Sequence, residues 1–312
     1  MPQPDVLIIG AGPAGLTAGI YASRAGHSVL ILEKELIGGQ ITKTAIVENY
    51  PGFARPINAI ELVQAMEQQA RHFGCEFKTA EVTGIRNIDG GQGFSLAVET
   101  TDGEFNPGAV IIATGTKPRN LEVPGEKELT GKGVSYCAVC DGPLFRNKEV
   151  AVVGGGDSAL EEAEFLTRFC SRVHLIHRRD EFRAAKITQD RIRANPKIRL
   201  LLSHTVVGIY GENHLEFLQV KDLKTGSVNP LPVAGLFIYA GLIPNTGFCQ
   251  GRINLDEAGF IITDDNLQTN IPGVFAAGDV RKKTVRQIAT AVGDGAVAGM
   301  MTHKYLTESH HQ

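Results

Sequence analysis

The chain has 312 residues, of which 43% are hydrophobic and 21% charged, so it is long enough for two globular domains with separate cores. Its formal net charge of -3, with no long run of Lys and Arg, argues against nucleic acid or a membrane surface as a partner. The N-terminus lacks the features of a signal peptide, and the longest apolar stretch, from about Leu231 to Ile243, is interrupted by Pro232 and two glycines. We therefore expect a cytoplasmic protein without a membrane span.

Strand-like and helix-like segments alternate along most of the chain. The strand-like segments are 5–9, 28–33, 110–113, 149–153, 172–176 and 235–239, and the helix-like segments are 14–24, 59–73, 158–169 and 286–305. Two hairpin-like segments, 94–103 and 215–226, lie about 120 residues apart. This repetition predicts an α/β protein with two Rossmann-like dinucleotide-binding domains, each with three layers in a ββα arrangement.

Turn-forming residues at 116–118 and 244–247 predict two breaks between domains. These turns would enclose a middle domain, residues 117–247, and leave residues 1–116 and 248–312 to form one discontinuous domain. An alternative division places two consecutive domains on either side of residue 120. The sequence separates these two divisions poorly.

The first dinucleotide fingerprint is Gly10-Ala11-Gly12-Pro13-Ala14-Gly15, which follows an apolar strand and opens a helix. Gly10 permits the tight turn, Gly12 lets the backbone approach a pyrophosphate, and Gly15 allows the helix to pack closely on the strand. Glu33 ends the next strand, 23 positions after Gly10, where a carboxylate can accept hydrogen bonds from ribose hydroxyls. The alternative interpretation is an ordinary glycine-rich loop.

The segment Cys137-Ala138-Val139-Cys140-Asp141 carries a cysteine pair with two residues between its members. Such a pair serves as a redox dithiol, as half of a zinc site, or as two buried structural thiols. A zinc site needs further ligands, and the sequence contains no second pair of this kind, so we expect no metal. Asp141 is a candidate general acid for a departing thiolate, or it forms an Asx-turn with the Gly-Pro that follows.

A second fingerprint, Gly154-Gly155-Gly156-Asp157-Ser158-Ala159, follows the strand 149–153. The position 23 residues after Gly154 is His177, which begins the segment His177-Arg178-Arg179-Asp180-Glu181-Phe182-Arg183. Guanidinium groups bind a 2′-phosphate where a carboxylate would repel it, so the second site should prefer NADPH to NADH. A solvated basic face is the alternative for the arginines, and His177 either stacks near the nucleotide or caps its strand.

Together, the Cys-x-x-Cys-Asp segment, both fingerprints and the arginine segment resemble the low-molecular-weight, prokaryotic-type thioredoxin reductases, which are class II pyridine nucleotide-disulfide oxidoreductases. Further matches are Gly38-Gly39-Gln40, Glu48-Asn49-Tyr50-Pro51-Gly52, Ala113-Thr114-Gly115, Gly278-Asp279 and Arg286-Gln287-Ile288. The larger glutathione-reductase-like enzymes carry their cysteines shortly after the first fingerprint, whereas residues 36–50 here contain none. The resemblance runs nearly from end to end.

The resemblance implies an NADPH-dependent thioredoxin-disulfide reductase, expected to be a homodimer, with FAD and NADPH as cofactors and thioredoxin as its partner. It assigns FAD to the discontinuous domain, where the matching segments would line the site, and NADPH to the middle domain. It also implies that Cys140 faces the flavin and that Cys137 attacks thioredoxin. A dithiol oxidase that uses oxygen and a nucleotide-sensing regulator are the competing functions, and the arginines count against the first of these.

Cys140 precedes Gly154 by only 14 residues, so the cysteine pair and the NADPH site should belong to one domain and the flavin to the other. The pair must meet the flavin in one half-reaction and thioredoxin in the other. We therefore expect the domains to rotate about the chain crossings near residues 117 and 245 during turnover.

Overall fold

The computed structural model describes residues 3–43, 46–47, 49–88, 95–249 and 251–309. Glu48 and Phe94, which belong to segments singled out above, lie outside the described residues. The chain divides into two compact units: unit 1 comprises Met1–Lys117 and Ile243–Gln312, and unit 2 comprises Pro118–Leu242. Each unit contains one parallel sheet.

Unit 1 is built on a five-stranded parallel sheet. The strands are, in spatial order, β20 (Val274–Ala276), β9 (Ala109–Ile112), β1 (Val6–Ile9), β2 (Val29–Glu33) and β5 (Glu76–Thr79). Since successive side chains of a strand point to opposite faces, Val6 and Ile8 enter one hydrophobic core while Leu7 and Ile9 enter another. Both faces of the sheet are therefore buried.

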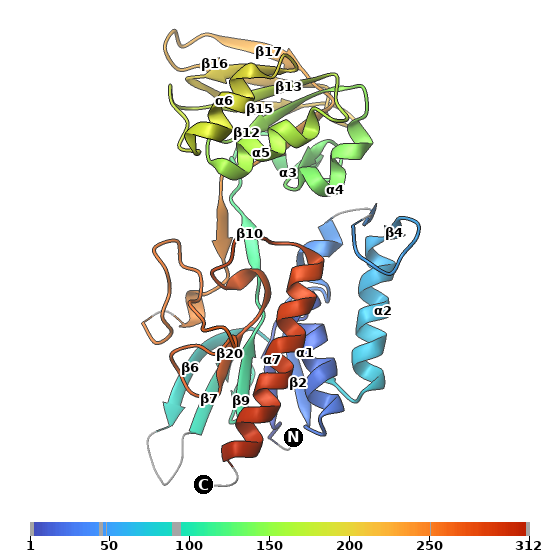
Figure 1. The fold of residues 1–312 in the computed structure, drawn as a ribbon, viewed down its shortest axis with the longest axis vertical. Helices are drawn as coiled ribbons and strands as arrows, with labels where there is room; N and C mark the ends of the chain where they lie inside the picture. Colours follow the sequence, from blue (N-terminus) through green and yellow to red (C-terminus); the bar gives the residue numbers. More distant parts are fainter. Residues whose placement is uncertain (1–2, 44–45, 48, 89–94, 250, 310–312) are drawn as a thin grey trace. The chain divides into compact units, whose positions relative to one another are not determined.

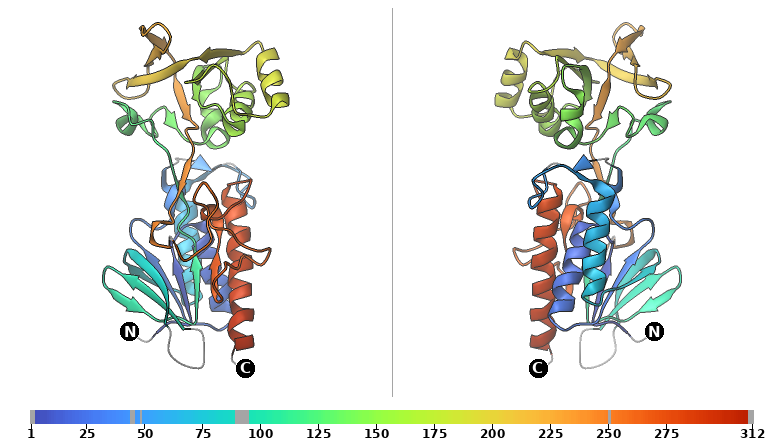
Figure 2. Two further views of the ribbon diagram at one scale, coloured as in Figure 1. Left: turned by 90° about the vertical axis from the view of Figure 1, so that its left-hand side faces the viewer. Right: turned by 90° about the vertical axis from the view of Figure 1, so that its right-hand side faces the viewer.

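Helices cover one face of this sheet and a small antiparallel sheet covers the other. The helices are α1 (Pro13–Arg24), α2 (Ala59–His72) and α7 (Ile288–Ser309), and the antiparallel strands are β6 (Val82–Ile88), β7 (Ser95–Thr100) and β8 (Gly103–Phe105) (Figure 1). The C-terminal helix α7 packs alongside α1, as the two views of Figure 2 show. These are three layers in a ββα arrangement.

Unit 2 repeats this plan with a parallel sheet whose strands are β11 (Val134–Ser135), β18 (Gly235–Ile238), β12 (Glu149–Val153), β13 (Arg172–His177) and β14 (Ile198–Leu202), in spatial order. Helix α5 (Asp157–Leu166) packs on one face. The antiparallel strands β15 (His204–Tyr210), β16 (Phe217–Asp222) and β17 (Val228–Pro232) cover the other. The shorter helices are α3 (Glu126–Leu129), α4 (Ala138–Asp141) and α6 (Lys186–Ala194).

The chain passes between the units at residues 117–118 and 242–243. The crossing segments are the strands β10 (Thr116–Pro118) and β19 (Leu242–Pro244), which pair with each other. Unit 1 also contains the strand pair β3 (Ile46–Val47) and β4 (Ile57–Asn58) and three 3₁₀ turns, η1 (Gly39–Lys43), η3 (Gly247–Cys249) and η4 (Gly278–Val280), while η2 (Gly142–Phe145) belongs to unit 2.

The predicted α/β class and the three-layer ββα arrangement are confirmed. Each predicted strand and helix is present to within a few residues, and both predicted hairpins occur, as β7–β8 and β16–β17. Helix α5 ends at Leu166, three residues before its predicted end, because residues 167–169 form tighter turns. Among the described residues, no helix is long and apolar enough to cross a lipid bilayer.

Candidate redox and dinucleotide-binding sites

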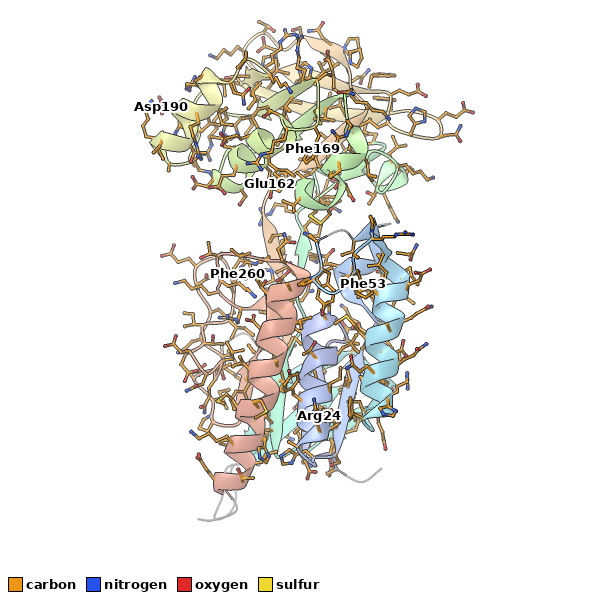
Figure 3. The ribbon with its side chains drawn as sticks, turned by 45° about the vertical axis from the view of Figure 1, so that its right-hand side comes forward. Arg24, Phe53, Glu162, Phe169, Asp190 and Phe260 are labelled. Carbon is orange, nitrogen blue, oxygen red and sulfur yellow. A yellow bond between two sulfur atoms is a disulfide. The ribbon has the colours of Figure 1, made fainter. Side chains whose placement is uncertain are left out.

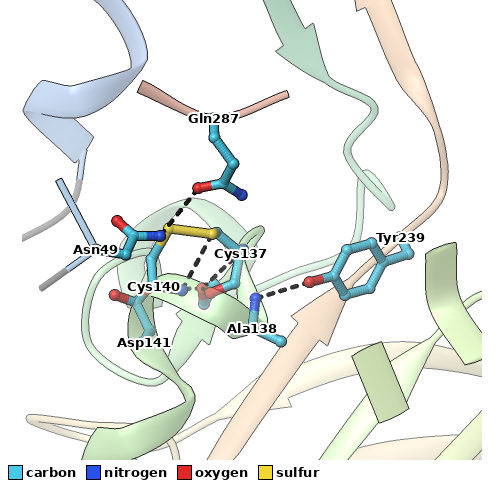
Figure 4. Close-up of a disulfide and its surroundings, with 8 residues drawn as sticks. Asn49, Cys137, Ala138, Cys140, Asp141, Tyr239 and Gln287 are labelled. Atoms are coloured by element: carbon cyan, nitrogen blue, oxygen red, sulfur yellow. Dashed lines mark hydrogen bonds between the residues drawn. A yellow bond between two sulfur atoms is a disulfide. The ribbon is translucent and has the colours of Figure 1, made fainter. Parts of the chain in front are cut away.

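Cys137 and Cys140 form a disulfide, with their Cα atoms 5.3 Å apart (Figure 4). They lie at the start of α4, where the Cys140 N–H donates to Sγ of Cys137 at 3.2 Å. Both residues are half-buried, whereas Cys75, Cys170 and Cys249 are buried free thiols. Because the disulfide engages both sulfurs and remains partly accessible, the arrangement is that of an exchangeable redox pair and not of a zinc half-site.

Two side chains that the sequence did not single out hold this turn. The Ser135 hydroxyl donates to Oδ2 of Asp141 at 2.7 Å, and its oxygen accepts from the Cys137 N–H at 3.1 Å. The Tyr239 hydroxyl oxygen accepts from the Ala138 N–H at 2.7 Å (Figure 4). Burial raises the pKa of Tyr239, so its hydroxyl stays neutral.

Ser135 and Tyr239 could have been found from topology. Ser135 ends β11 and Tyr239 directly follows β18, and these two strands are neighbours in the sheet. Parallel strands end at the same edge, so both side chains reach the turn that carries the disulfide. The order of strands in the sheet was the missing information.

The first fingerprint joins β1 to α1, as predicted, and its glycines are required by close backbone contacts. A Cβ added at Gly10, whose φ is +105°, would lie 2.5 Å from the carbonyl oxygen of Ala113, and one at Gly15 would lie 1.9 Å from that of Gly10. At Gly12, by contrast, an added Cβ would meet no atom within 4 Å. The N-terminus of α1 therefore faces open space, as a site for a pyrophosphate requires.

Glu33 anchors this loop. Its Oε2 accepts from the Ala11 N–H at 2.9 Å, while Oε1 accepts from the backbone N–H groups of Lys34 and Glu35. The carboxylate is thereby held at the end of β2 beside the glycine-rich loop. A hydrogen bond from Glu33 to a ribose is compatible with this position, because each carboxylate oxygen can accept more than one hydrogen bond.

The other segments assigned to FAD gather around the first fingerprint. Gly38 donates through its N–H to Ala11, and an added Cβ at Gly39 would be 3.8 Å from Cα of Gly12. Gly278 touches Ala14, because an added Cβ there would lie 2.8 Å from the Ala14 Cβ. Gly10 meets Ala113, which leads into Thr114 and Gly115.

Polar contacts tie the remaining candidates together within unit 1. The Gln40 side chain donates to the Thr116 carbonyl, and Nδ2 of Asn49 donates to Oε1 of Gln287 at 3.0 Å. Asn245, which the sequence did not single out as a site residue, exchanges two hydrogen bonds of 2.8 Å with Thr114. These contacts join η1 and the segment after β19 to the segment after β9, and the segment after β3 to the residue that precedes α7.

Asp279 and Arg286 lie at the end of unit 1 where α7 begins. Oδ1 of Asp279 is buried and has no hydrogen-bond partner among the described residues, and burial raises the pKa of this carboxyl group. The Arg286 guanidinium lies over the Phe260 ring, 4.2 Å from its centroid, and donates to the Asp279 carbonyl at 3.4 Å. Ile288 is the first residue of α7 and packs against the core.

An ion-pair cluster supports the turn that carries Asp279. The Asp294 carboxylate accepts from the Gly278 N–H at 3.0 Å, from two nitrogens of Arg281, and from Nζ of Lys283 at 2.8 Å. Burial alone would raise the pKa of Asp294, but the hydrogen bonds from Arg281 and Lys283 outweigh burial and lower it. No motif in the sequence marks this cluster.

The second fingerprint joins β12 to α5. An added Cβ at Gly154 would lie 2.4 Å from the Ala159 Cβ, and one at Gly155 would lie 2.2 Å from the His177 ring. Gly156, the N-cap of α5, again faces open space, with no atom within 4 Å of an added Cβ. Ser158 is exposed in the first turn of α5.

The arginine segment folds back onto this fingerprint. The Arg183 N–H donates to the Gly155 carbonyl at 2.7 Å, and Oδ1 of Asp157 accepts from the Ala185 N–H at 2.7 Å. Arg178, Arg179 and Arg183 are exposed, and none of them forms an ion pair within the described part of the chain. Their guanidinium groups are therefore available to a phosphate.

His177 covers Gly155 and stacks on Phe182, with ring centroids 5.5 Å apart. The side chain is 7% exposed, and burial lowers its pKa. Nε2 has no hydrogen-bond partner among the described residues. His177 is thus a neutral ring at the glycine-rich turn, and a ligand there could satisfy its free nitrogen.

The residues present fit the two dinucleotides that the sequence implies. In unit 1, the open space at Gly12 and the unpartnered Asp279 oxygen suit a pyrophosphate and a polyhydroxylated chain, which FAD provides. In unit 2, the open space at Gly156 and the unpaired arginines suit a pyrophosphate and a 2′-phosphate, which NADPH provides.

Comparison with known proteins gives concordant matches. The family model described as pyridine nucleotide-disulphide oxidoreductase matches residues 4–295. The thioredoxin reductase of Listeria innocua is 46% identical over 97% of this chain and 94% of its own length, and that of Bacillus subtilis is 45% identical over 97% and 95%. The crystal structure of thioredoxin reductase from Streptococcus pyogenes, 46% identical, covers 98% of both chains with a TM-score of 0.90.

Proposed function

The chain belongs to the pyridine nucleotide-disulphide oxidoreductase family and, within it, to the thioredoxin reductases, and from this we propose how its residues perform the reaction. It is an NADPH-dependent flavoprotein that reduces the disulfide of thioredoxin. The observation that carries the assignment is the half-buried Cys137–Cys140 disulfide on the same unit as the arginine-bearing fingerprint.

FAD, when bound, accepts a hydride from NADPH and delivers two electrons to a disulfide. We assign its site to unit 1, where Gly12, Glu33 and Asp279 would hold it together with the segments gathered around them. NADPH is assigned to unit 2, where Arg178, Arg179 and Arg183 would hold its 2′-phosphate.

The cysteine pair performs the exchange with thioredoxin. Two electrons convert the disulfide to a dithiol, after which the Cys137 thiolate attacks the thioredoxin disulfide and forms a mixed disulfide, releasing one thioredoxin thiolate. Cys140 then attacks Sγ of Cys137, restores the disulfide and releases the second thiolate. Asp141 is placed to supply the proton that a departing thiolate needs, with its carboxyl group oriented by Ser135.

The division into two units supports alternation between half-reactions. The chain crosses between the units only at 117–118 and 242–243, and both crossings lie in the paired strands β10 and β19. A rotation there would let the disulfide and NADPH take turns at the flavin while exposing the dithiol to thioredoxin. A cross-link between the two units should abolish steady-state turnover but permit one half-reaction.

We assign the enzyme to the cytoplasm as a homodimer. Cys75, Cys170 and Cys249 are free thiols, which suits a reducing compartment. Tyr21, Val297 and Met300, on the packed helices α1 and α7, are large apolar side chains that remain 36–46% exposed and could pack against a second copy. Sedimentation of the FAD-loaded protein would test the oligomeric state, and a concentration-independent monomer would contradict the assignment.

The activity itself is tested with NADPH, NADH and reduced ferredoxin as donors against thioredoxins and glutaredoxins as acceptors. NADPH with thioredoxin should give the highest kcat/KM. If ferredoxin were the effective donor, or if NADPH were oxidised by oxygen without any dependence on thioredoxin, the proposed electron route would be wrong.

A further inference from the structure

A groove of about 890 Å³ lies on unit 2 at the amino-terminal edge of its parallel sheet. Lys148 and Glu149 at the start of β12, Arg172 at the start of β13 and Arg199, the second residue of β14, line this edge. The glycine-rich fingerprint and His177 lie at the opposite, carboxyl ends of β12 and β13. The groove is therefore separate from the NADPH site on the same sheet.

The groove carries more cations than anions. Lys132, Lys148, Arg172 and Arg199 line it, and none of them forms an ion pair in the part of the chain that the structure describes. The carboxylates of Glu149 and Glu216 also line it. Glu149 is engaged by His174 at 2.9 Å, and this hydrogen bond lowers its pKa against the opposing effect of burial, with smaller contributions from the charges of Arg172 and Arg199. Positive charge therefore remains in excess around the groove.

Apolar side chains and one buried polar ring complete the lining. Phe145 and Leu231, which are half-buried, contribute apolar surface between the cations, and the buried side chains of Leu215 and Val233 lie behind them. His174 also lines the groove, is 2% exposed, and has no hydrogen-bond partner for its Nδ1 among the described residues.

We propose that this groove binds a small anionic ligand that combines a phosphate or carboxylate group with a flat apolar ring. The anionic group would contact the arginines and lysines, and the ring would lie against the apolar lining. The volume is within the range of sites for small organic ligands, which is roughly 300–1,000 Å³. Binding here takes no part in the electron route, so the proposal stands or falls independently of the reductase activity.

Pyridoxal 5′-phosphate is a suitable probe, because it carries an aromatic ring, a phosphate and an aldehyde that forms an imine with nearby lysines. The FAD-loaded enzyme is first saturated with NADP⁺ to fill the nucleotide site assigned above. It is then labelled, trapped with cyanoborohydride and mapped by peptide mass spectrometry. We expect Lys132 and Lys148 to be labelled at least about fivefold faster than Lys127, an exposed lysine of unit 2 that lies outside the groove.

The double variant Arg172→Gln/Arg199→Gln should reduce this labelling at least about fivefold. The matched variant Arg193→Gln/Lys224→Gln, which removes two positive charges from unit 2 outside the groove, should leave it unchanged. Equal rates at Lys127 and the groove lysines, or labelling that survives loss of both groove arginines, would overturn the proposal.

Protection of the unaltered enzyme keeps the test independent of variant folding. Phenyl phosphate should protect Lys132 and Lys148 from labelling at a lower concentration than inorganic phosphate does, because only phenyl phosphate can also use the apolar lining. Protection of Lys127 should be the same for both anions. If the two anions protected the groove lysines equally, or neither did so, a site for a ring-bearing anion would be ruled out.

Discussion

The hydroxyl of Ser135 donates a hydrogen bond of 2.7 Å to Oδ2 of Asp141 and accepts one from the backbone of Cys137. One side chain thus links the candidate general acid to the first cysteine of the redox pair. Since Ser135 ends a strand of the parallel sheet, the position of the Asp141 carboxyl group is set by the sheet rather than by the single helical turn to which Asp141 belongs. The arrangement favours a catalytic role for Asp141 over a purely local turn.

Asp141→Asn should lower the rate of thioredoxin reduction by about 100-fold or more, because the amide cannot donate a proton to the departing thiolate. Flavin reduction by NADPH should be unaffected. The pH dependence of kcat separates this role from a structural one. The variant should lose the fall in kcat at high pH that deprotonation of the acid causes. Ser135→Ala keeps the Asp141 carboxyl group and should have a much smaller effect on the rate. A wild-type pH profile in Asp141→Asn would exclude Asp141 as the general acid.

Arg178→Gln/Arg183→Gln should raise the KM for NADPH by about 10- to 100-fold, because charge-assisted hydrogen bonds to the 2′-phosphate would be lost. The KM for NADH should change little, which makes the ratio of the two KM values the decisive measurement. Arg193→Gln, on α6 of the same unit, is the control. An equal increase in both KM values would show that these arginines do not read the 2′-phosphate.

Glu162, labelled in Figure 3, should make the stability of the protein depend on pH. Burial, reinforced by repulsion from Glu161, raises the pKa of its carboxyl group from 4.5 to about 7. The folded chain therefore binds this proton more tightly than the unfolded chain, and the free energy of unfolding should fall as the pH rises from 4.5 to about 7.

Glu162→Gln should remove this pH-dependent fall in the free energy of unfolding. Its urea midpoint, relative to that of the wild type, should rise across the same pH interval and level off above it, whereas Glu161→Gln, an exposed neighbour, should give a flatter difference. The measurement is a set of urea titrations from about pH 5 to about pH 8. A pH-independent difference for Glu162→Gln would mean that this carboxyl group has an ordinary pKa.

Asp294→Asn should destabilise unit 1 by about 3 kcal/mol and weaken FAD binding, because Arg281 and Lys283 would lose their shared carboxylate partner. The side chains of Asp294 and Lys283 are only 12% and 8% exposed, so water replaces the interaction poorly. Urea unfolding and titration of the apoprotein with FAD are the measurements. Glu308→Gln removes an exposed ion pair from the same helix and should cost less than about 0.5 kcal/mol.

The sequence predicted the elements whose residues carry a periodic pattern or a glycine signature. The central strands of both sheets were predicted because buried parallel strands are continuously apolar. The two fingerprints were predicted from their glycines, which close backbone contacts require, such as that of Gly10 with Ala113. Strands such as β20 (Val274–Ala276) were not predicted, because three residues carry too little pattern to identify a strand.

The parts of the site that escaped prediction depend on contacts between distant segments. Tyr239 reaches Ala138 across 101 positions, and Asn245 reaches Thr114 across 131. Neither residue lies in a recognisable motif, so only the three-dimensional fold reveals its partner. The same is true of Asp294, whose carboxylate supports the Gly278–Asp279 turn. Asp294 lies in α7, and the sequence of this helix contains no motif that would single the residue out.

We propose that electrons reach thioredoxin through the Cys137–Cys140 pair, and stopped-flow absorbance of Cys140→Ser is the decisive measurement. After reduction by NADPH, the flavin of the wild type and of the control Cys170→Ser should be reoxidised when thioredoxin is added. Cys140→Ser should still be reduced by NADPH, but thioredoxin-dependent reoxidation should fall by about 1,000-fold or more. Reoxidation of Cys140→Ser by thioredoxin at the wild-type rate would show that electrons reach thioredoxin without the Cys137–Cys140 pair.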